Sequence, residues 1–267
     1  MHDYPWMTDD LAVIRHTFGP DDLRPLLAAY GIRSSVLVQT RSSALETRAF
    51  LELASRTDFI AGVVGWVDLT GPDVGDTLAG LQAGAGGQYL RAIRHQVHDE
   101  PDPDWLQQES VLNGLRAVQD AGLAYDLLIR ARELPAAIEV AQRLPDLRLV
   151  VDHLAKPPIV TGELGGWEGG MAALSRHENV SCKLSGMVTE ASWSRWTVAD
   201  LRPYVERVLT WFGPERLMFG SDWPVCLLAT SYKEVFETCS MLMAGLSQSN
   251  RDNVLGGNAI DVYRLDI

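Results

Sequence analysis

The stretch RLMFGSDWP, residues 216–224, runs from an apolar segment directly into a carboxylate, Asp222, and an indole, Trp223. The apolar part is typical of a buried β-strand. Pro224 ends that strand, because proline has no N–H to donate to the ladder. The strand therefore delivers Asp222 to the edge of a sheet. The other strands of this sheet, and the polar side chains at their ends, decide the fold.

Six more short apolar runs, rich in β-branched residues, precede this one. They cover residues 34–40, 60–69, 89–96, 124–129, 147–157 and 180–187. Several are almost continuously apolar, as expected of parallel strands that are buried on both faces. Between the runs, apolar residues three and four apart predict amphipathic helices. Clear examples are residues 19–32, 45–55, 108–122 and 134–145. This alternation continues without a break in composition, which predicts one domain of βα units spanning residues 1–267.

A closed barrel explains the pattern better than an open dinucleotide-binding sheet. The two Gly-rich segments, GAGGQ (84–88) and GGWEGG (165–170), lack the spacing of a dinucleotide fingerprint, and we predict loops for both. Polar residues instead end several different strands, which is how (β/α)8 TIM barrels build their sites.

The strand count is one short of the eight that such a barrel needs. No strand precedes the helix at 19–32, so the first strand is predicted to be missing from the chain as written. Its loss would leave two buried-type strands with unpaired edges, which natural proteins avoid. We therefore expect the chain as written to begin in the loop after strand one, through a wrongly assigned start codon, trimming or a genuine shortening.

Composition narrows the possible partners. The 267 residues carry 35 acidic and 23 Lys or Arg side chains, a net charge of −12. Nucleic acids and anionic membranes require a basic surface, so neither is an expected partner. Three scattered cysteines, with no membrane span and no signal peptide, indicate a cytoplasmic protein.

Charged and polar side chains gather at the predicted strand ends. They are Arg94, His95, Asp126, Asp152, His153, Lys156, Lys183 and Asp222. A single strand-end Asp usually caps a turn, and Asp152 and Lys156 could each simply brace the DHLAKPP loop. Convergence of the set on one rim predicts a site. No GxSxG, HExxH or Cys/His zinc spacing is present, which favours a carboxylate and an imidazole acting on water.

Two motifs, VVDHLAKPPI (150–159) and FGSDWPVC (219–226), carry a specific resemblance. Together with RAIRHQVHDEPDPDWL (91–106), YDLLI (125–129) and YPWM (4–7), they resemble the sugar-lactonase branch of the amidohydrolase superfamily. This branch comprises L-fuconolactonases and L-rhamnonolactonases, with pyrone-dicarboxylate lactonase more distant. The resemblance runs the length of the chain.

The resemblance implies a metal-dependent-hydrolase-like barrel whose first strand bears a His-x-His pair. That pair is absent here, and His2 does not replace it. Asp222 matches the aspartate of strand eight that activates water, and His153 matches the histidine of strand six. Metal-dependent members have a histidine on strand five, where this chain has Tyr125 and Asp126. We therefore expect either no required cofactor or one divalent metal, zinc or manganese, held by His153 and Asp222.

The predicted reaction is hydrolysis of a small-molecule sugar lactone to the open aldonate. Asp222 and His153 are the predicted catalytic residues. The predicted substrate-binding residues are Arg94, His95, Asp126, Lys183 and Trp223. Two alternatives stay open: a metal-dependent amidohydrolase or decarboxylase, which would purify with stoichiometric metal, and an inactive barrel that binds a sugar acid. The inactive barrel would be stabilised by its ligand without turning it over.

Overall fold

Seven parallel strands form one curled sheet, in the order in which they occur along the chain. The computed structural model describes residue 4 and residues 7–267, so His2 and residues 5–6 of the YPWM motif lie outside it. The strands are β1 (Ser35–Val38), β2 (Ile60–Gly65), β3 (Leu90–His95), β4 (Ala124–Leu127), β5 (Leu149–Val151), β6 (Val180–Leu184) and β7 (Leu217–Phe219). All seven predicted strands are confirmed.

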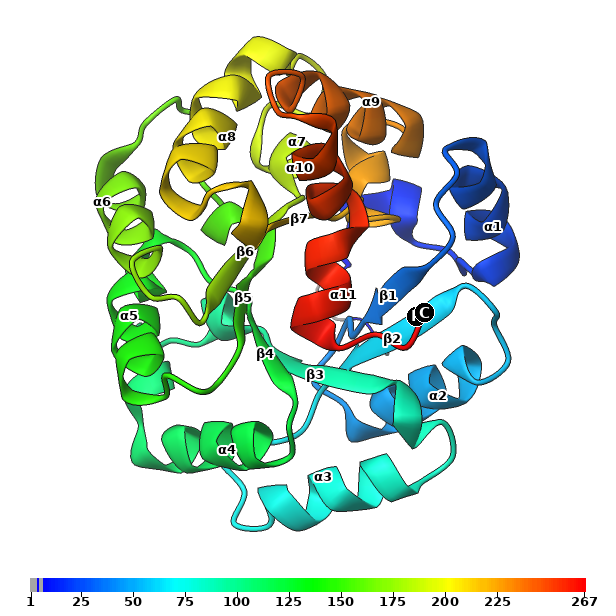
Figure 1. Ribbon diagram of the computed structural model, residues 1–267, viewed down its shortest axis with the longest axis vertical. Coiled ribbons are helices and arrows are strands. Elements are labelled where there is room, and N and C mark those ends of the chain that lie inside the picture. The colour runs from blue at the N-terminus through cyan, green and yellow to red at the C-terminus, as the bar shows by residue number, and fades with distance from the viewer. Residues whose placement is uncertain (1–3, 5–6) are drawn as a thin grey trace.

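Helices connect or flank the strands, and most of them lie around the outer face of this sheet (Figure 1). They are α1 (Pro20–Ala29), α2 (Ala44–Ala54), α3 (Val74–Ala83), α4 (Glu109–Asp120), α5 (Leu134–Arg143), α6 (Gly165–Leu174), α7 (Met187–Glu190), α8 (Val198–Phe212), α9 (Tyr232–Leu242), α10 (Gln248–Asp252) and α11 (Asn258–Tyr263). Within the described residues β7 does not pair with β1, so the structure is a barrel that lacks one strand, as predicted.

Alternation along the strands separates two apolar layers, because successive side chains of a strand point to opposite faces. The outer layer packs the sheet against the helices and includes Val63, Ile93 and Leu149. The inner layer fills the middle of the barrel, with small and medium side chains from the strands and one tyrosine from the last helix. It consists of Val64, Ala92, Ala124, Val150, Met218 and Tyr263.

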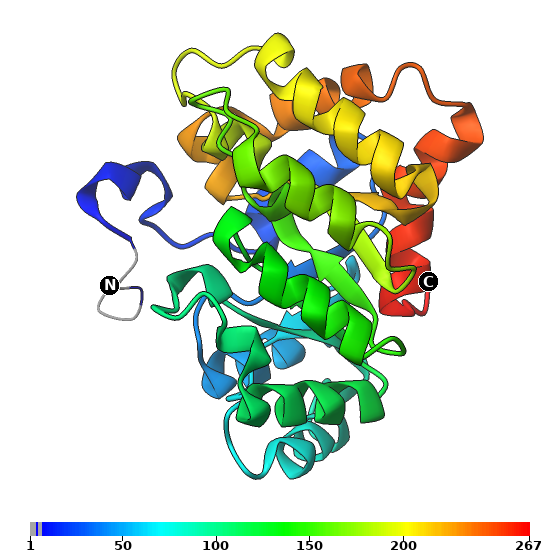
Figure 2. The same ribbon diagram turned by 90° about the vertical axis from the view of Figure 1, so that its left-hand side faces the viewer.

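The last helix, α11, closes the inner layer from one end. Its Tyr263 is only 2% exposed and packs with inner-face residues from five strands. In Figure 1 α11 lies beside β7, near the gap between β7 and β1. Figure 2 shows the C-terminus on the opposite side of the molecule from the segment that precedes α1.

One loop prediction was wrong. The Gly-rich segment 165–170 begins helix α6 instead of forming a loop. Glycine disfavours helix by about 1 kcal/mol per residue relative to alanine, but tertiary packing routinely overrides propensity. Here Trp167, Met171 and Leu174 are buried on one face of α6, at the three- and four-residue spacing of a helix.

No helix in the described part of the chain is long and apolar enough to cross a membrane. Cys182, Cys226 and Cys239 are buried and form no disulfide.

Candidate active site

A layer of charged side chains sits directly above the inner apolar layer. Three apolar inner-face residues are each followed, two positions later, by a charged residue. The pairs are Ala92 and Arg94, Ala124 and Asp126, and Val150 and Asp152. A two-residue step returns a strand to the same face, so these charged groups face one another at the carboxyl ends of β3, β4 and β5.

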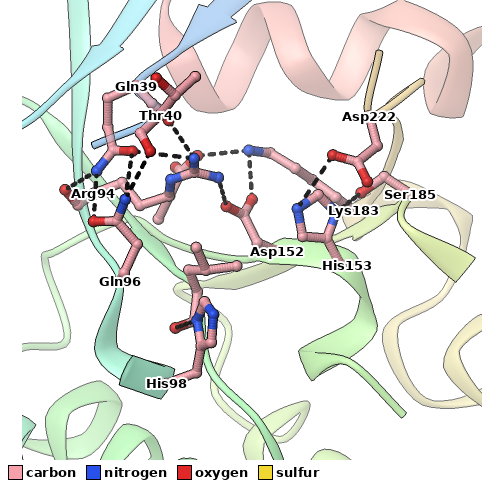
Figure 3. Close-up of polar contacts among 12 residues, drawn as sticks. Gln39, Thr40, Arg94, Gln96, His98, Asp152, His153, Lys183, Ser185 and Asp222 are labelled. Carbon is pink, nitrogen blue, oxygen red and sulfur yellow. Dashed lines mark hydrogen bonds and ion pairs between the residues drawn. The ribbon is translucent and has the colours of Figure 1, made fainter. Parts of the chain in front are cut away.

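Four charged side chains pair with one another, and Figure 3 labels three of them, Arg94, Asp152 and Lys183. Arg94 Nη1 lies 2.7 Å from Asp152 Oδ2. Lys183 Nζ, from β6, lies 2.6 Å from Asp152 Oδ1 and 2.6 Å from Asp126 Oδ2. The hydroxyl of Tyr263 donates to Asp126, at 2.9 and 3.0 Å from its two oxygens. Both carboxylates are fully buried, and each of their oxygens lies within ion-pair or hydrogen-bond distance of a partner, so this network forms the floor of the site.

The network sets the charges of its members. Burial raises the pKa of Asp126 to about 6, although Lys183 opposes the rise. Burial acts the same way on Asp152, but Lys183 and Arg94 together outweigh it and hold the pKa of that carboxyl well below its usual range. The two carboxylates raise the pKa of Lys183 against the effect of its own burial. Asp152 and Lys183 are therefore charged at neutral pH.

His153 and Asp222 face each other beside this network (Figure 3). Nε2 of His153 lies 3.7 Å from Oδ1 of Asp222, and the two side chains are 13% and 16% exposed. The other ring nitrogen, Nδ1, lies 2.8 Å from Oγ of Ser185. Burial raises the pKa of Asp222 to about 7, with Lys156 and Arg94 opposing the rise. Burial also lowers the pKa of His153 to about 3, which keeps the imidazole neutral. A carboxyl with a pKa near 7 can exchange a proton with a bound water, and the neutral imidazole beside it can donate a hydrogen bond.

An unusual backbone turn brings His153 to this position. Two residues after outward-facing Val151, His153 would point to the outer face of β5 if the strand continued. Instead four consecutive residues from His153 to Lys156 adopt φ between 47° and 57°. Left-handed backbone costs about 1–2 kcal/mol for each non-glycine residue. Such strain persists only where the surroundings enforce it, and it is common at functional sites.

Asp222 also has left-handed backbone, with φ of 53°. Aspartate tolerates this region better than most residues do. Asp222 follows inner-face Met218 and Gly220 in steps of two, past the end of β7. The neighbouring Trp223 packs edge-on against Phe18, with ring centroids 5.2 Å apart, so the segment before α1 covers one side of the site.

His95 is not part of this group. It lies two positions after outward-facing Ile93, and both of its ring nitrogens are engaged. Trp66 donates to Nδ1 at 3.0 Å, and Nε2 lies 2.7 Å from Glu100 Oε1. Its ring stacks on Trp105, with centroids 4.4 Å apart. The structure thus brings Arg94, Asp126, His153, Lys183 and Asp222 together and separates His95 from them.

Lys156 ends the left-handed turn and pairs with Glu190, with Nζ and Oε1 2.6 Å apart. Sequence reasoning missed Glu190, Ser185 and Tyr263, which all contact predicted site residues. Ser185 could have been found, because it follows Lys183 by two positions at the end of a predicted strand. Tyr263 gave no signal, because it lies on a helix at the far end of the chain.

The described residues do not make up a complete metal site. Among them no group of three or more His, Cys, Asp or Glu side chains could hold an ion. His153 and Asp222 supply two donors, whereas catalytic zinc takes three protein ligands.

Comparisons with known proteins relate the chain to one family. The amidohydrolase family model matches residues 2–265. An L-fucono-1,5-lactonase of Burkholderia ambifaria is 41% identical over 267 residues, covering 98% of this chain and 90% of that protein. A second L-fucono-1,5-lactonase, from Burkholderia multivorans, is 37% identical over 98% of this chain and 91% of that protein. A crystal structure of an amidohydrolase from Burkholderia multivorans with bound zinc has a TM-score of 0.94 and 36% identity, covering 99% of this chain and 95% of that one.

Proposed function

Because the chain belongs to the amidohydrolase family, we propose that it hydrolyses the ring ester of a sugar-acid lactone to the open aldonate. The observation that carries this proposal is the His153–Asp222 pair at the carboxyl ends of the strands, where barrels of this class place their chemistry. The similarity to L-fucono-1,5-lactonases over nearly the whole chain supports a lactone as the substrate.

Asp222 acts as the general base. Its ionised carboxylate takes a proton from a water molecule while the water oxygen attacks the lactone carbonyl. The ring C–O bond then breaks, and Asp222 returns the proton to the departing ring oxygen. A pKa near 7 suits both halves of this cycle, because proton transfer is most efficient when the pKa lies close to the working pH.

His153 stabilises the oxyanion that forms on the carbonyl oxygen. If the Ser185 hydroxyl donates to Nδ1, the ring proton resides on Nε2 and points into the site beside Asp222. A donor aimed at the developing charge is among the largest contributions an enzyme makes to such a reaction. Arg94 lies nearby, but Asp152 and the backbone of Gln39 hold its guanidinium, so it contributes mainly positive potential.

Lys183 and Trp223 hold the sugar part of the substrate, and Asp126 supports Lys183. Lys183 is 12% exposed and can donate a hydrogen bond to a hydroxyl of the substrate. The fully buried Asp126 holds the Lys183 ammonium in place through their ion pair. Trp223 provides an apolar wall for the carbon face of the ring.

The bound zinc in the Burkholderia multivorans amidohydrolase favours a second candidate, a metal-dependent hydrolase. In this chain His153 and Asp222 are the residues that would contribute to such a site. Among the described residues these two donors are one fewer than a catalytic zinc ion takes, so this candidate ranks below the metal-independent mechanism.

The experiment that tests the proposal follows acid release with a pH indicator across a panel of aldonolactones. The parent protein should turn over at least one of them, and Asp222→Asn should lower that rate by about 10²–10⁴-fold. Asp58→Asn, which changes an exposed carboxylate paired with Arg24, is the matched control and should leave the rate unchanged. Hydrolysis by Asp222→Asn at the parent rate would refute the assignment of the base.

A further inference from the structure

The left-handed turn from His153 to Lys156 is held at both of its ends by one neighbouring segment, residues 185–190. At the first end, Nδ1 of His153 lies 2.8 Å from Oγ of Ser185. At the other end, Nζ of Lys156 lies 2.6 Å from Oε1 of Glu190. Both contacts join the loop after β5 to the loop and short helix α7 after β6. A turn fixed at both ends leaves His153, its first residue, little freedom to rotate its imidazole.

Two further hydrogen bonds reinforce the same arrangement. Trp167 donates from Nε1 to the carbonyl of Leu154 in the middle of the turn, at 2.6 Å. The backbone N–H of Val160 donates to the carbonyl of Glu190 at 3.0 Å. Glu190 therefore contacts the loop after His153 through both its side chain and its backbone.

The Lys156–Glu190 pair is well shielded from water. The two side chains are 19% and 15% exposed, compared with 50% and 76% for the ion pair between Arg24 and Asp58. Exposed ion pairs contribute little, whereas removing one partner of a shielded pair leaves an uncompensated charge. Loss of either partner should therefore let the turn relax from its strained backbone.

We propose that the Lys156–Glu190 ion pair is a positioning element of the active site, which locks the left-handed turn so that Nε2 of His153 faces Asp222. This inference rests on the proposed function, because it assigns the pair an effect on lactone hydrolysis. It makes Lys156 and Glu190 positioning residues and not groups that touch the substrate.

Steady-state kinetics with the best lactone of the panel test the proposal. Lys156→Met and Glu190→Gln should each lower kcat by about 10- to 100-fold with KM unchanged, since a misplacement of about 1 Å can cost that much. The double variant should lose little more than either single variant, because both changes break one interaction. The charge-conserving Lys156→Arg should retain most of the parent kcat. Arg24→Met and Asp58→Asn, at the exposed pair, are the controls and should leave kcat unchanged.

Other kinetic outcomes overturn the proposal. A raised KM with unchanged kcat in Lys156→Met alone would make Lys156 a substrate-binding residue. Parent-like kcat in both single variants would leave the pair without a positioning role. Additive losses in the double variant would mean that the two residues act separately.

A spectroscopic measurement keeps this inference distinct from the proposed function. The ring nitrogens of His153 can be observed by NMR in protein labelled with ¹⁵N-histidine, and His153→Asn assigns the signal among the six histidines of the chain. We expect one fixed tautomer in the parent and an averaged signal in Glu190→Gln. An unchanged His153 signal in Glu190→Gln would refute the positioning role. If the parent protein hydrolyses no lactone, the proposed function is refuted. The NMR measurement alone then decides whether the Lys156–Glu190 pair positions His153.

Discussion

Gly186 and His153 are in such close contact that a Cβ atom added at Gly186 would lie 2.7 Å from the imidazole ring. Gly186 also has φ of 63°, where residues with a side chain are strained. The residue between the His153 partner Ser185 and helix α7 is therefore glycine for two independent reasons. Both concern the placement of the histidine.

Gly186→Ala should displace the His153 ring and lower kcat. Expressed as free energies, the loss in kcat should exceed the loss in the free energy of unfolding. Gly31→Ala is a matched control, because Gly31 has nearly the same φ, 66°, but nothing within 4 Å of its added Cβ. The two variants share the backbone penalty, so the difference between their kcat values reports the contact with His153. Equal kcat values would contradict a role for this contact.

The activity should rise with pH around a midpoint near 7. Asp222 must be ionised to accept a proton, and burial raises the pKa of its carboxyl to about 7. The profile of kcat/KM against pH, measured on an uncharged lactone, reports this pKa for the free enzyme. His153 should add no second step between pH 5 and 9, since its pKa lies near 3. A midpoint at 4 would show that Asp222 is not desolvated.

The free energy of unfolding of Asp222→Asn should increase relative to that of the parent as the pH rises. The folded pKa of Asp222 is raised from its ordinary value of 3.8 to about 7, so its contribution to stability is full below pH 3.8 and is lost as the pH rises through 7. The amide of the variant does not ionise, so the variant does not lose this stability, which is on the order of a few kcal/mol at pH 8. Urea unfolding of both proteins at pH 5 and pH 8 measures the difference, and a gap that does not widen with pH would contradict it.

Tyr263→Phe should destabilise the protein by about 1–3 kcal/mol, because it removes a buried hydrogen bond to a charged group. Tyr263 is 2% exposed and donates to Asp126 at 2.9 Å. Tyr204→Phe, whose hydroxyl makes only long contacts of 3.4 and 3.5 Å, should cost less in the same urea titration. Equal losses would show that the Tyr263 hydroxyl adds nothing specific.

Chelation of divalent metals should leave lactone hydrolysis unchanged. The described residues offer two donors, His153 and Asp222, one fewer than a catalytic zinc ion requires. Activity is compared before and after treatment with EDTA and desalting, with the metal content measured in both samples. Loss of activity that added zinc or manganese restores would favour the metal-dependent alternative.

The sequence predicted the barrel because strands buried on both faces leave a strong local signal. All seven runs became strands, and the strand-end positions of Arg94, Asp126, Asp152, Lys183 and Asp222 follow from them. The alternation of side chains along β3 also distinguishes Arg94 from His95. Because Ala92 faces the inside of the barrel and Ile93 the outside, Arg94 and His95 point to opposite faces of β3.

Two features were decided only by the tertiary structure. The first is the direction of the His153 side chain. Strand alternation alone would point it outward, whereas the left-handed turn points it toward Asp222. Local preferences oppose such a turn, so only contacts with distant residues such as Ser185 and Glu190 can maintain it. The second is the closing of the charged network by Tyr263, which lies 137 residues from Asp126 in the chain. The sequence by itself thus determined which strands carry the chemical groups, because periodicity and apolar content are local. Packing between distant segments decided where His153 points and how the charges of the network are balanced.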